Sequence, residues 1–193
     1  MERQRSLEGV FPEISTARLD MKALDPGQAR RLNEIWTDPR VIEYMVLDPF
    51  TEMEQTCEMI ETLRGLHGAG LGIRWAVCLR DGGTVLGTCG FHNWRREHHR
   101  AEIGYELDSL YWRQGFMGEA VSAALEHGFE TMDLNRVEAF VTVGNRLSWG
   151  FLKKMGFTLE GTLRAYEWAR GRHQDQWVFS LLREEWRREK TRP

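Results

Sequence analysis

The hydrophobic period changes in the middle of the chain, and this change constrains the fold more than any other feature. Residues 74–80 and 84–94 have the pattern of strands, and the Asp-Gly-Gly at 81–83 between them is a hairpin turn signal. A polar loop over 95–99 leads to a third strand at 100–107. The pattern therefore predicts an antiparallel meander.

Helical patterns lie on both sides of the meander. Asp25 and Pro26 are typical of an N-cap followed by proline in the first helical turn. A capping-box pattern predicts a second helix over 51–67. After the meander, apolar residues recur at helical spacing over 115–132.

Further segments complete the order of elements. Strands are expected at 17–24, 137–143, 157–163 and 176–182, with a short helix over 148–155. This order favours an α/β fold in which helices cover both faces of a mixed sheet. We expect an N-terminal extension at 1–13, a single domain over 14–184 and a charged tail over 185–193.

Composition argues against several classes of protein. The net charge of −3 and the pI near 6.1 give no general attraction to nucleic acid or to an anionic membrane. No apolar run approaches the ~20 residues of a membrane span, and residues 1–8 lack the apolar stretch of a secretion signal. The three cysteines are widely spaced and odd in number, which is typical of reduced core residues in the cytoplasm.

Three histidines lie close together near the end of the second strand of the meander. His92, His98 and His99 do not have zinc-site spacing, so we predict no metal and interpret them as part of a solvated hairpin loop. The locally basic loop over 95–100 is interpreted in the same way.

The segment after the third strand is the most informative for function. The strand ends at Leu107, and a short loop carrying Arg113, Gln114 and Gly115 opens a helix. Glycine lets a backbone approach a ligand closely, and a helix start presents free N–H groups at its positive end. These features favour a pyrophosphate site, although a plain strand-to-helix turn has the same pattern. The dinucleotide fingerprint and the P-loop motif are both absent.

A second segment lies some thirty residues further on. Asn145 stands just beyond a predicted strand, Ser148 is well placed as an N-cap, and Gly156 as the glycine that ends the helix. Capping explains Ser148 and Gly156. It does not explain Asn145 or the pairing with the glycine loop upstream.

The two segments resemble the acyl-CoA loop and the N-x-x-S helix of the GNAT acetyltransferase superfamily. Within it, the chain is most similar to the RimJ/RimL group, named for N-terminal acetylation of ribosomal proteins, over roughly residues 14–184. Further segments carry the resemblance at 15–19 (STARL), 101–107 (AEIGYEL) and 157–164 (FTLEGTLR). The resemblance implies a mixed, mostly antiparallel sheet of about six to seven strands with a splayed central pair.

The resemblance also implies where acetyl-CoA binds. The backbone of Glu106 and Leu107 would bond the pantetheine arm, and Asn145 would bind its amide region. Seven residues would surround the pyrophosphate: Arg113, Gln114, Gly115, Phe116, Met117, Gly118 and Glu119. The loop departs from the superfamily pattern Q/R-x-x-G-x-G/A, because Trp112 replaces the leading Q/R and Met117 the last small residue.

Attack on a thioester requires an unprotonated amine. An α-amino group has a pKa near ~8 and lysine near ~10.4, so the α-amine needs less help at pH 7. A carboxylate could remove the proton, and the candidates are Glu102 and Glu167, with Glu160 less favoured. By resemblance, Glu167 matches a carboxylate suggested as base, and Ser148 matches the proposed proton donor to the leaving thiolate. A solvated surface acid is the alternative for both candidates.

Three functions are compatible with these observations. The first is a protein N-terminal acetyltransferase acting on a ribosomal or other protein. The second is the same chemistry on a small amine such as an amino acid, a polyamine or an antibiotic. The third is a non-catalytic acyl-CoA-binding module, which Ser148 and the carboxylates disfavour. Variable loops build acceptor pockets, so the acceptor stays open here, as do the acyl length and the choice between monomer and homodimer.

Overall fold

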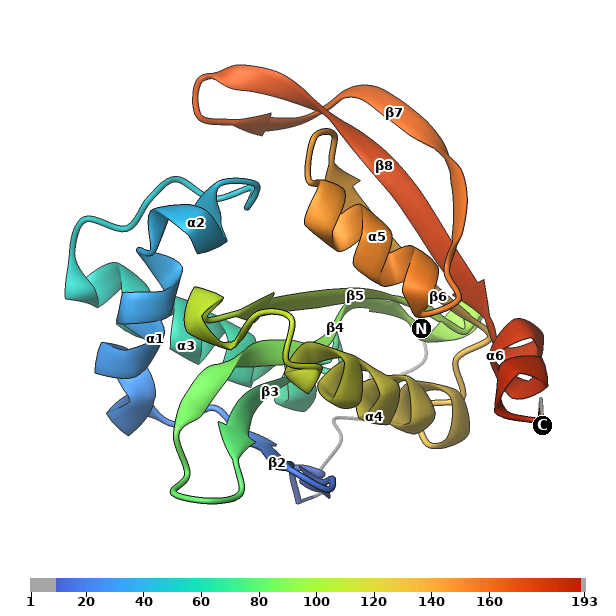
Figure 1. Ribbon diagram of the computed structural model, residues 1–193, viewed down its shortest axis with the longest axis horizontal. Coiled ribbons are helices and arrows are strands. Elements are labelled where there is room, and N and C mark those ends of the chain that lie inside the picture. Colours follow the sequence, from blue (N-terminus) through green and yellow to red (C-terminus); the bar gives the residue numbers. More distant parts are fainter. Residues whose placement is uncertain (1–9, 192–193) are drawn as a thin grey trace, which may run out of the picture.

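One sheet forms the centre of the molecule. The structure, a computed structural model, describes residues 10–191 and contains an eight-stranded sheet in the order β1-β2-β3-β4-β5-β6-β8-β7 (Figure 1). Neighbouring strands are antiparallel except β5 and β6, which are parallel. The strands are β1 (Ile14–Ser15), β2 (Leu19–Ala23), β3 (Ile73–Leu79), β4 (Val85–Arg95), β5 (Arg100–Leu107), β6 (Arg136–Thr142), β7 (Thr158–Ala169) and β8 (Arg172–Leu182).

Helices cover both faces of this sheet. They are α1 (Ala29–Trp36), α2 (Pro39–Ile42), α3 (Met53–Ala69), α4 (Phe116–Glu130), α5 (Arg146–Lys154) and α6 (Arg183–Lys190). Three short 3-10 turns precede α1, follow β4 and follow β5. The mixed sheet with helices on both faces confirms the predicted fold class.

Alternate residues of the central strands supply two separate cores. On β3, Trp75 and Val77 belong to the core under α4, whereas Ala76 and Cys78 belong to the core under α1 and α3. Figure 1 shows α4 apart from the α1–α3 pair, with the central strands between them. Because β3 is buried on both faces, it reads as a continuous apolar run in the sequence.

The parallel pair β5–β6 is bonded only at one end. Its last paired residues are Glu102 and Glu138, yet β5 continues to Leu107 and β6 to Thr142. Beyond this point β6 pairs only with β8, all the way to Thr142. The sheet therefore opens between β5 and β6.

Charged side chains fasten the closed end of the pair. Glu138 accepts hydrogen bonds from Arg100 at 2.9 Å and from Arg136 at 2.8 Å. Arg136 also binds both carboxylate oxygens of Glu160, at 2.7 and 2.6 Å, and the Ser180 hydroxyl donates to Glu160 at 2.6 Å. The Arg136 guanidinium lowers the pKa of Glu160 to about 2. We call these five residues the closed-end network; they join β5, β6, β7 and β8.

The structure corrects several expectations about local elements. His92 lies within β4, not in a solvated loop, because that strand extends to Arg95. The two last strands form a long hairpin that reaches Ala169 and Arg172, well beyond the predicted ends. Cys78 and Cys89 are buried as expected, but Cys57 is exposed on α3.

The structure describes only part of the expected N-terminal extension and of the expected C-terminal tail. Residues 1–9 of the expected extension lie outside the described residues, as do 192–193 of the expected tail. At the start of the described part, the Trp75 indole donates to the Pro12 carbonyl at 2.6 Å, and the Phe11 ring packs edge-on against Trp75. Residues 11 and 12 are therefore attached to the core. No helix of the described part is long and apolar enough to cross a bilayer.

Candidate active site

Beyond Glu102, the edge of β5 that faces β6 is not paired with that strand. The Asp108 N–H donates to the Leu86 carbonyl on the β4 side at 2.7 Å. Bonded and non-bonded pairs alternate along antiparallel strands, so the backbone of Glu106 faces β4 while those of Tyr105 and Leu107 face the opening. The Glu106 carbonyl also leaves no room for a side chain at Gly87. Of the two residues predicted to bond pantetheine through their backbone, only Leu107 faces the opening.

Trp112 fixes the turn that follows β5. Its indole N–H donates to the Leu107 carbonyl at 2.8 Å. In the sequence this tryptophan looked like a departure from the superfamily motif, without an assigned role. In the structure it ties the loop to the end of the open strand.

The start of α4 lacks a side-chain cap. Its N-cap is Gly115, at φ +84°, and the first bond returning to it comes from the Glu119 N–H at 3.1 Å. The first-turn amides of Phe116, Met117 and Gly118 are therefore available to an acceptor from outside the helix. At Gly118, a Cβ would meet nothing within 4 Å. Uncapped amides at the positive end of a 15-residue helix suit an anion.

Arg18 braces this loop from the neighbouring strand segment. It donates to the Gln114 carbonyl at 3.0 Å, forms an ion pair with Glu119 at 2.7 Å, and stacks over the Phe116 ring at 4.4 Å. Sequence reasoning gave Arg18 no role, although it lies in the segment 15–19 that carried part of the resemblance.

The other side chains of the predicted loop have different surroundings. Glu119 also accepts from the Thr16 hydroxyl; burial acts to raise the pKa of Glu119, but the bonds from Thr16 and Arg18 outweigh burial and lower it. Met117 is buried in the core under α4. Arg113 is exposed at φ +61°, and the Gln114 amide donates to the Leu110 carbonyl at 2.9 Å.

Asn145, Ser148 and Tyr105 meet beside the opening. The N-cap of α5 is Asn145, whose Oδ1 accepts from the Ser148 N–H at 3.0 Å. The prediction of Ser148 as the N-cap was wrong, since the helix begins two residues earlier, at Arg146. Released from capping, the Ser148 hydroxyl lies 2.6 Å from the Tyr105 hydroxyl.

Tyr105 is a functional candidate that sequence reasoning missed. Its ring packs edge-on against Phe151 of α5 at 5.0 Å, and burial raises the pKa of the phenol. It therefore stays protonated at neutral pH. Its place in the predicted third strand, two residues before Leu107, was the available signal.

The two predicted carboxylate bases lie apart from this group. The carboxylate of Glu102 lies 3.2 Å from Nε2 of His92 on β4. Burial acts to raise the pKa of Glu102, but bonds from His92 and Asn93 and the charge of Arg100 outweigh burial and lower it. Glu167 is half-buried on β7 opposite Gln174, in an irregular stretch of the hairpin. Within residues 10–191, no hydrogen bond joins either carboxylate to Ser148.

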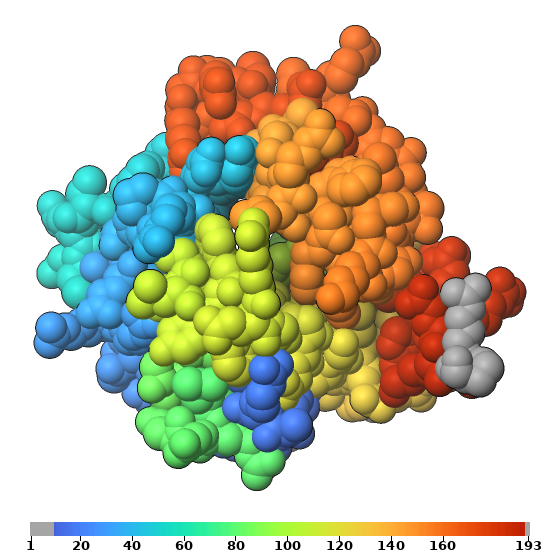
Figure 2. All heavy atoms as spheres, viewed as in Figure 1, coloured from blue at the N-terminus to red at the C-terminus, as the bar shows by residue number. Residues whose placement is uncertain are grey.

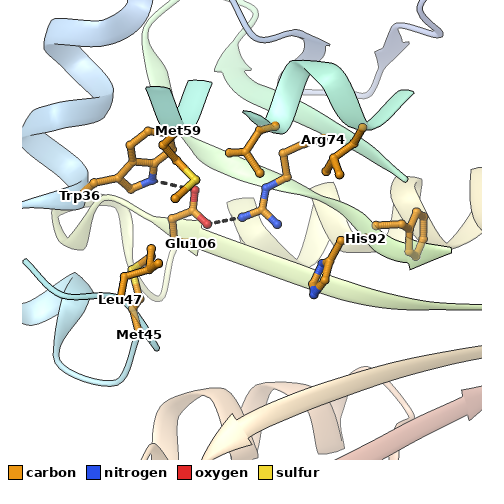
Figure 3. A pocket seen from close by; sticks show the side chains of 10 residues that line it. Trp36, Met45, Leu47, Met59, Arg74, His92 and Glu106 are labelled. Carbon is orange, nitrogen blue, oxygen red and sulfur yellow. Dashed lines mark hydrogen bonds and ion pairs between the residues drawn. The ribbon is translucent and has the colours of Figure 1, made fainter. Parts of the chain in front are cut away.

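A buried polar cluster lies on the face of β5 opposite Tyr105. Glu106 accepts from the Trp36 indole at 3.0 Å, and it also binds Arg74 and the Thr88 hydroxyl. Arg74 in turn donates to Thr88 at 2.6 Å. Figure 3 shows the Arg74 guanidinium between Glu106 and His92. The side chain of Glu106, predicted only as a backbone contact, thus belongs to a fixed internal cluster.

This cluster forms the polar wall of a pocket of about 310 Å³. Apolar side chains from α3 and from the loop after α2 line the rest of it: Met45, Leu47, Met59, Leu63 and Leu66. Figure 3 shows Met45, Leu47 and Met59 around the same space as Glu106.

The β7–β8 hairpin reaches over towards this side of the molecule. At its tip, Arg170 donates to the carbonyls of Glu43 and Ile42 at the end of α2, the former at 3.0 Å. Figure 1 shows the hairpin passing over α5 towards α2, and Figure 2 shows a recess where the segment after β5, α5 and the α2 region meet. No group of three or more His, Cys, Asp or Glu residues among 10–191 is arranged to hold a metal ion.

Comparisons with known proteins agree with this geometry. The family model described as the acetyltransferase (GNAT) domain matches residues 18–158. The uncharacterized N-acetyltransferase p20 of Bacillus licheniformis is 39% identical over 173 residues, which cover 90% of this chain and 97% of p20. The [ribosomal protein uS5]-alanine N-acetyltransferase of Escherichia coli is 26% identical over 121 residues, 62% of each chain.

A solved structure of another acetyltransferase has the same fold. RimL, the ribosomal L7/L12 α-N-protein acetyltransferase, in complex with coenzyme A, superposes with a TM-score of 0.79 at 22% identity, covering 89% of this chain and 98% of RimL. At this identity the likeness shows the fold alone. An opened β5–β6 pair, a family model that matches most of the chain and a relative aligned along nine-tenths of it lead to one conclusion: this chain belongs to the GNAT family of N-acetyltransferases.

Proposed function

We propose that this enzyme transfers the acetyl group of acetyl-CoA to the α-amino group of a protein N-terminus, in the manner of the RimJ/RimL group. One observation carries the proposal: β5 continues beyond its last bond to β6, beside a helix whose first turn has no side-chain cap. GNAT acetyltransferases use acetyl-CoA. The open edge suits the amides of its pantetheine arm, and the helix start suits its pyrophosphate.

Each part of acetyl-CoA has a counterpart among the chain's own groups. The amides of 116–118 would hold the pyrophosphate, with the exposed Arg113 adding positive charge. The backbone of Tyr105 and Leu107 would pair with the pantetheine arm as with an added strand. Asn145 uses its Oδ1 to cap α5, which leaves its NH₂ group to donate to a pantetheine carbonyl.

Ser148 would deliver a proton to the departing sulfur. When the amine attacks, the C–N bond forms, the C–S bond breaks, and the thiolate requires a proton. Burial raises the pKa of Tyr105, which keeps the proton on its hydroxyl, and we assign this hydroxyl as the donor in the bond with Ser148. The Ser148 proton is then free to point at the sulfur. Tyr105 is thus a positioning residue and Ser148 a catalytic one.

A carboxylate would receive the proton from the amine, directly or through one water. Glu102 and Glu167 remain the candidates. The bonds that lower the pKa of Glu102 also weaken it as a base. Glu167 accepts no hydrogen bond from another described residue, so Glu167 is the one we assign to this role.

Two arguments support an α-amine acceptor. An α-amino group loses its proton more readily than a lysine side chain, which suits a site whose candidate bases are ordinary carboxylates. The relative from Escherichia coli is named as an alanine N-acetyltransferase that acts on ribosomal protein uS5.

Acetyl-CoA turnover against a panel of acceptors tests the proposal. The panel contains peptides with free and blocked N-termini, each with an internal lysine, together with amino acids, polyamines and aminoglycosides. We expect release of CoA with free N-terminal peptides and none with blocked ones. Turnover confined to the small amines would assign the enzyme to the small-molecule class instead. Binding of acetyl-CoA without turnover on any acceptor would indicate a non-catalytic module.

A further inference from the structure

The pocket between the sheet and helices α1 and α3 has a composition that indicates what it holds. It lies on the face of β5 that carries Glu102 and Glu106, whereas Tyr105 points to the opposite face. The start of α4, where the pyrophosphate would bind, belongs to that opposite side. A molecule in the pocket would therefore approach the open edge of β5 from the side away from CoA, as an acceptor must.

The apolar part of the pocket is large. Its aliphatic side chains are long and unbranched or γ-branched, and with the polar cluster they line a pocket of about 310 Å³ in total. A dry apolar cavity of about 150 Å³ holds a molecule the size of benzene. A methyl or hydroxymethyl group, as in an acceptor that begins with alanine or serine, would leave most of this pocket to water.

The polar part of the pocket contains a donor with spare capacity. Arg74 is nine-tenths buried, and its bonds to Thr88 and Glu106 use Nε and one terminal nitrogen, Nη2. Its other terminal nitrogen, Nη1, forms no bond within residues 10–191 and lies over Gly104, where a Cβ would be only 2.7 Å away. Glycine at 104 thus makes room for the guanidinium, which lines the pocket with Nη1 still able to donate.

The charges around this donor favour a neutral oxygen over a carboxylate. Arg74 is already paired with Glu106, and His92 beside it is paired with Glu102. The two carboxylates outnumber the one fixed positive charge, that of Arg74, because the His92 imidazole is charged only when protonated; this arrangement favours an ammonium group over a third carboxylate. A peptide carbonyl fits beside Nη1; the free carboxylate of an amino acid does not.

We propose that this pocket is a specificity subsite for the first residue of the acceptor, and that it selects a peptide beginning with a large apolar residue such as leucine, methionine or phenylalanine. Arg74 Nη1 donates to the carbonyl of that first residue, and the α3 side chains enclose its side chain. This inference rests on the proposed function and narrows it to one class of N-terminus.

The test uses the full chain and six-residue peptides that differ only in their first residue: alanine, serine, leucine, methionine or phenylalanine. Leucinamide and free leucine are measured beside them. We expect kcat/KM to be at least ~10-fold higher for the large apolar residues than for alanine or serine, the range in which hydrophobic pockets discriminate. The kcat/KM for leucinamide should also be higher than that for free leucine.

A pair of α3 variants links the preference to the pocket. Leu63→Trp fills the space and should lower kcat/KM for the leucine peptide about 10-fold, with less than ~3-fold change for the alanine peptide. Thr62→Trp adds the same ring on the exposed face of α3 and should change neither. Met59→Ala enlarges the pocket without adding bulk, and it should weaken discrimination between leucine and alanine. KM for acetyl-CoA should stay constant in all three.

Each contrary outcome has a distinct meaning. Equal or better turnover of alanine and serine peptides overturns the subsite while leaving N-terminal acetylation intact. Preference for free leucine over leucinamide overturns the assignment of Arg74 to a neutral carbonyl. Turnover of small amines alone, with no peptide acetylated, refutes the proposed function itself. Loss of the leucine preference in Thr62→Trp as well as Leu63→Trp would place the selectivity outside the pocket.

Discussion

The two ends of the β5–β6 pair are built in opposite ways from the same two strands. At the closed end, backbone pairing stops at Glu102 and Glu138, and the closed-end network joins four strands through charge-assisted bonds. At the open end, the strand edges share no backbone bond. The polar contacts there are small and local, between Tyr105 and Ser148, between Asn145 and the Ser148 N–H, and between Trp112 and the Leu107 carbonyl, and the first turn of α4 has no side-chain cap.

This difference assigns stability to one end and ligand binding to the other. Buried polar groups that satisfy each other stabilise the native state but offer nothing to a ligand. Unpaired backbone groups cost stability, and a ligand that pairs with them recovers that cost. Substitutions at the closed end should therefore change the free energy of unfolding, and those at the open end should change binding or turnover.

Arg136→Met should have the largest effect, and on stability alone. It leaves Glu138 and Glu160 without their shared cation, and breaking a partly buried pair of this kind should lower the free energy of unfolding by about 2–3 kcal/mol. Urea unfolding monitored by tryptophan fluorescence measures this. Arg188→Met is the matched control, because its pair with Glu184 is largely exposed and should contribute at most ~0.5 kcal/mol. A rise in the Kd for acetyl-CoA in the folded Arg136→Met variant would contradict the division of roles.

Gly115→Val should have the next largest effect, on acetyl-CoA binding. Valine at φ +84° is strained, and its Cβ would lie 3.3 Å from Arg18 Nη2, so the turn must shift away from the first-turn amides. Loss of one charge-assisted bond to the pyrophosphate corresponds to about a 10- to 100-fold rise in Kd. Calorimetric titration checks it, with Gly82→Val in the β3–β4 turn as the matched control, because Gly82 has a similar φ of +80° and its Cβ would meet nothing within 4 Å. A folded Gly115→Val protein with unchanged affinity would move the phosphate site elsewhere.

Ser148→Ala should lower kcat about tenfold with little change in the Kd for acetyl-CoA. The thiol of CoA, with a pKa near ~8.5, is a good leaving group, so the effect lies at the low end of general-acid contributions. Since Asn145 caps α5, the alanine variant should lose less than the ~1 kcal/mol of a removed cap. Tyr105→Phe should also lower kcat, but by a smaller factor. Unchanged kcat at saturating acetyl-CoA in Ser148→Ala would remove the proton-donor role.

The smallest expected effect is a pH dependence at the closed end. The folded-state pKa of Glu160, about 2, lies below its ordinary value of 4.5, so its contribution to stability is present above pH 4.5 and is lost as the pH falls towards 2. Since Glu160 is 41% exposed, screening reduces this contribution to about 1 kcal/mol. Unfolding free energies of the wild type and Glu160→Gln at pH 6 and pH 3 should converge at the lower pH. A constant difference across this range would mean that the Arg136 pair does not set that pKa.

The sequence predicts the elements that depend on neighbouring residues better than those that depend on distant segments of the chain. The meander over 74–107 follows from local period and turn chemistry, which act between neighbouring residues. The extension of the β7–β8 hairpin beyond the two predicted strands was missed because residues 164–175 are mostly exposed and lack the apolar alternation that marks a half-buried strand.

In the candidate site, too, local sequence patterns predict only part of the arrangement. Gly115 is recognisable because its backbone conformation, at φ +84°, needs that residue type locally, whereas the local pattern assigned the cap of α5 to Ser148 instead of Asn145. Tyr105 and Ser148 touch only because β5 and α5, more than forty residues apart, converge at the opening. The partners of Glu106 come from three separate segments. Contacts of this kind depend on the tertiary fold, which no local pattern encodes.

Amide hydrogen exchange with and without acetyl-CoA tests most directly whether the open end is where the ligand binds. The amides of Tyr105, Leu107 and residues 116–118 should exchange markedly more slowly when acetyl-CoA is bound, while those of 136–138 at the closed end should change little. Equal protection at both ends, or protection that omits 105–107 while acetyl-CoA is bound, would contradict binding along the open edge of β5.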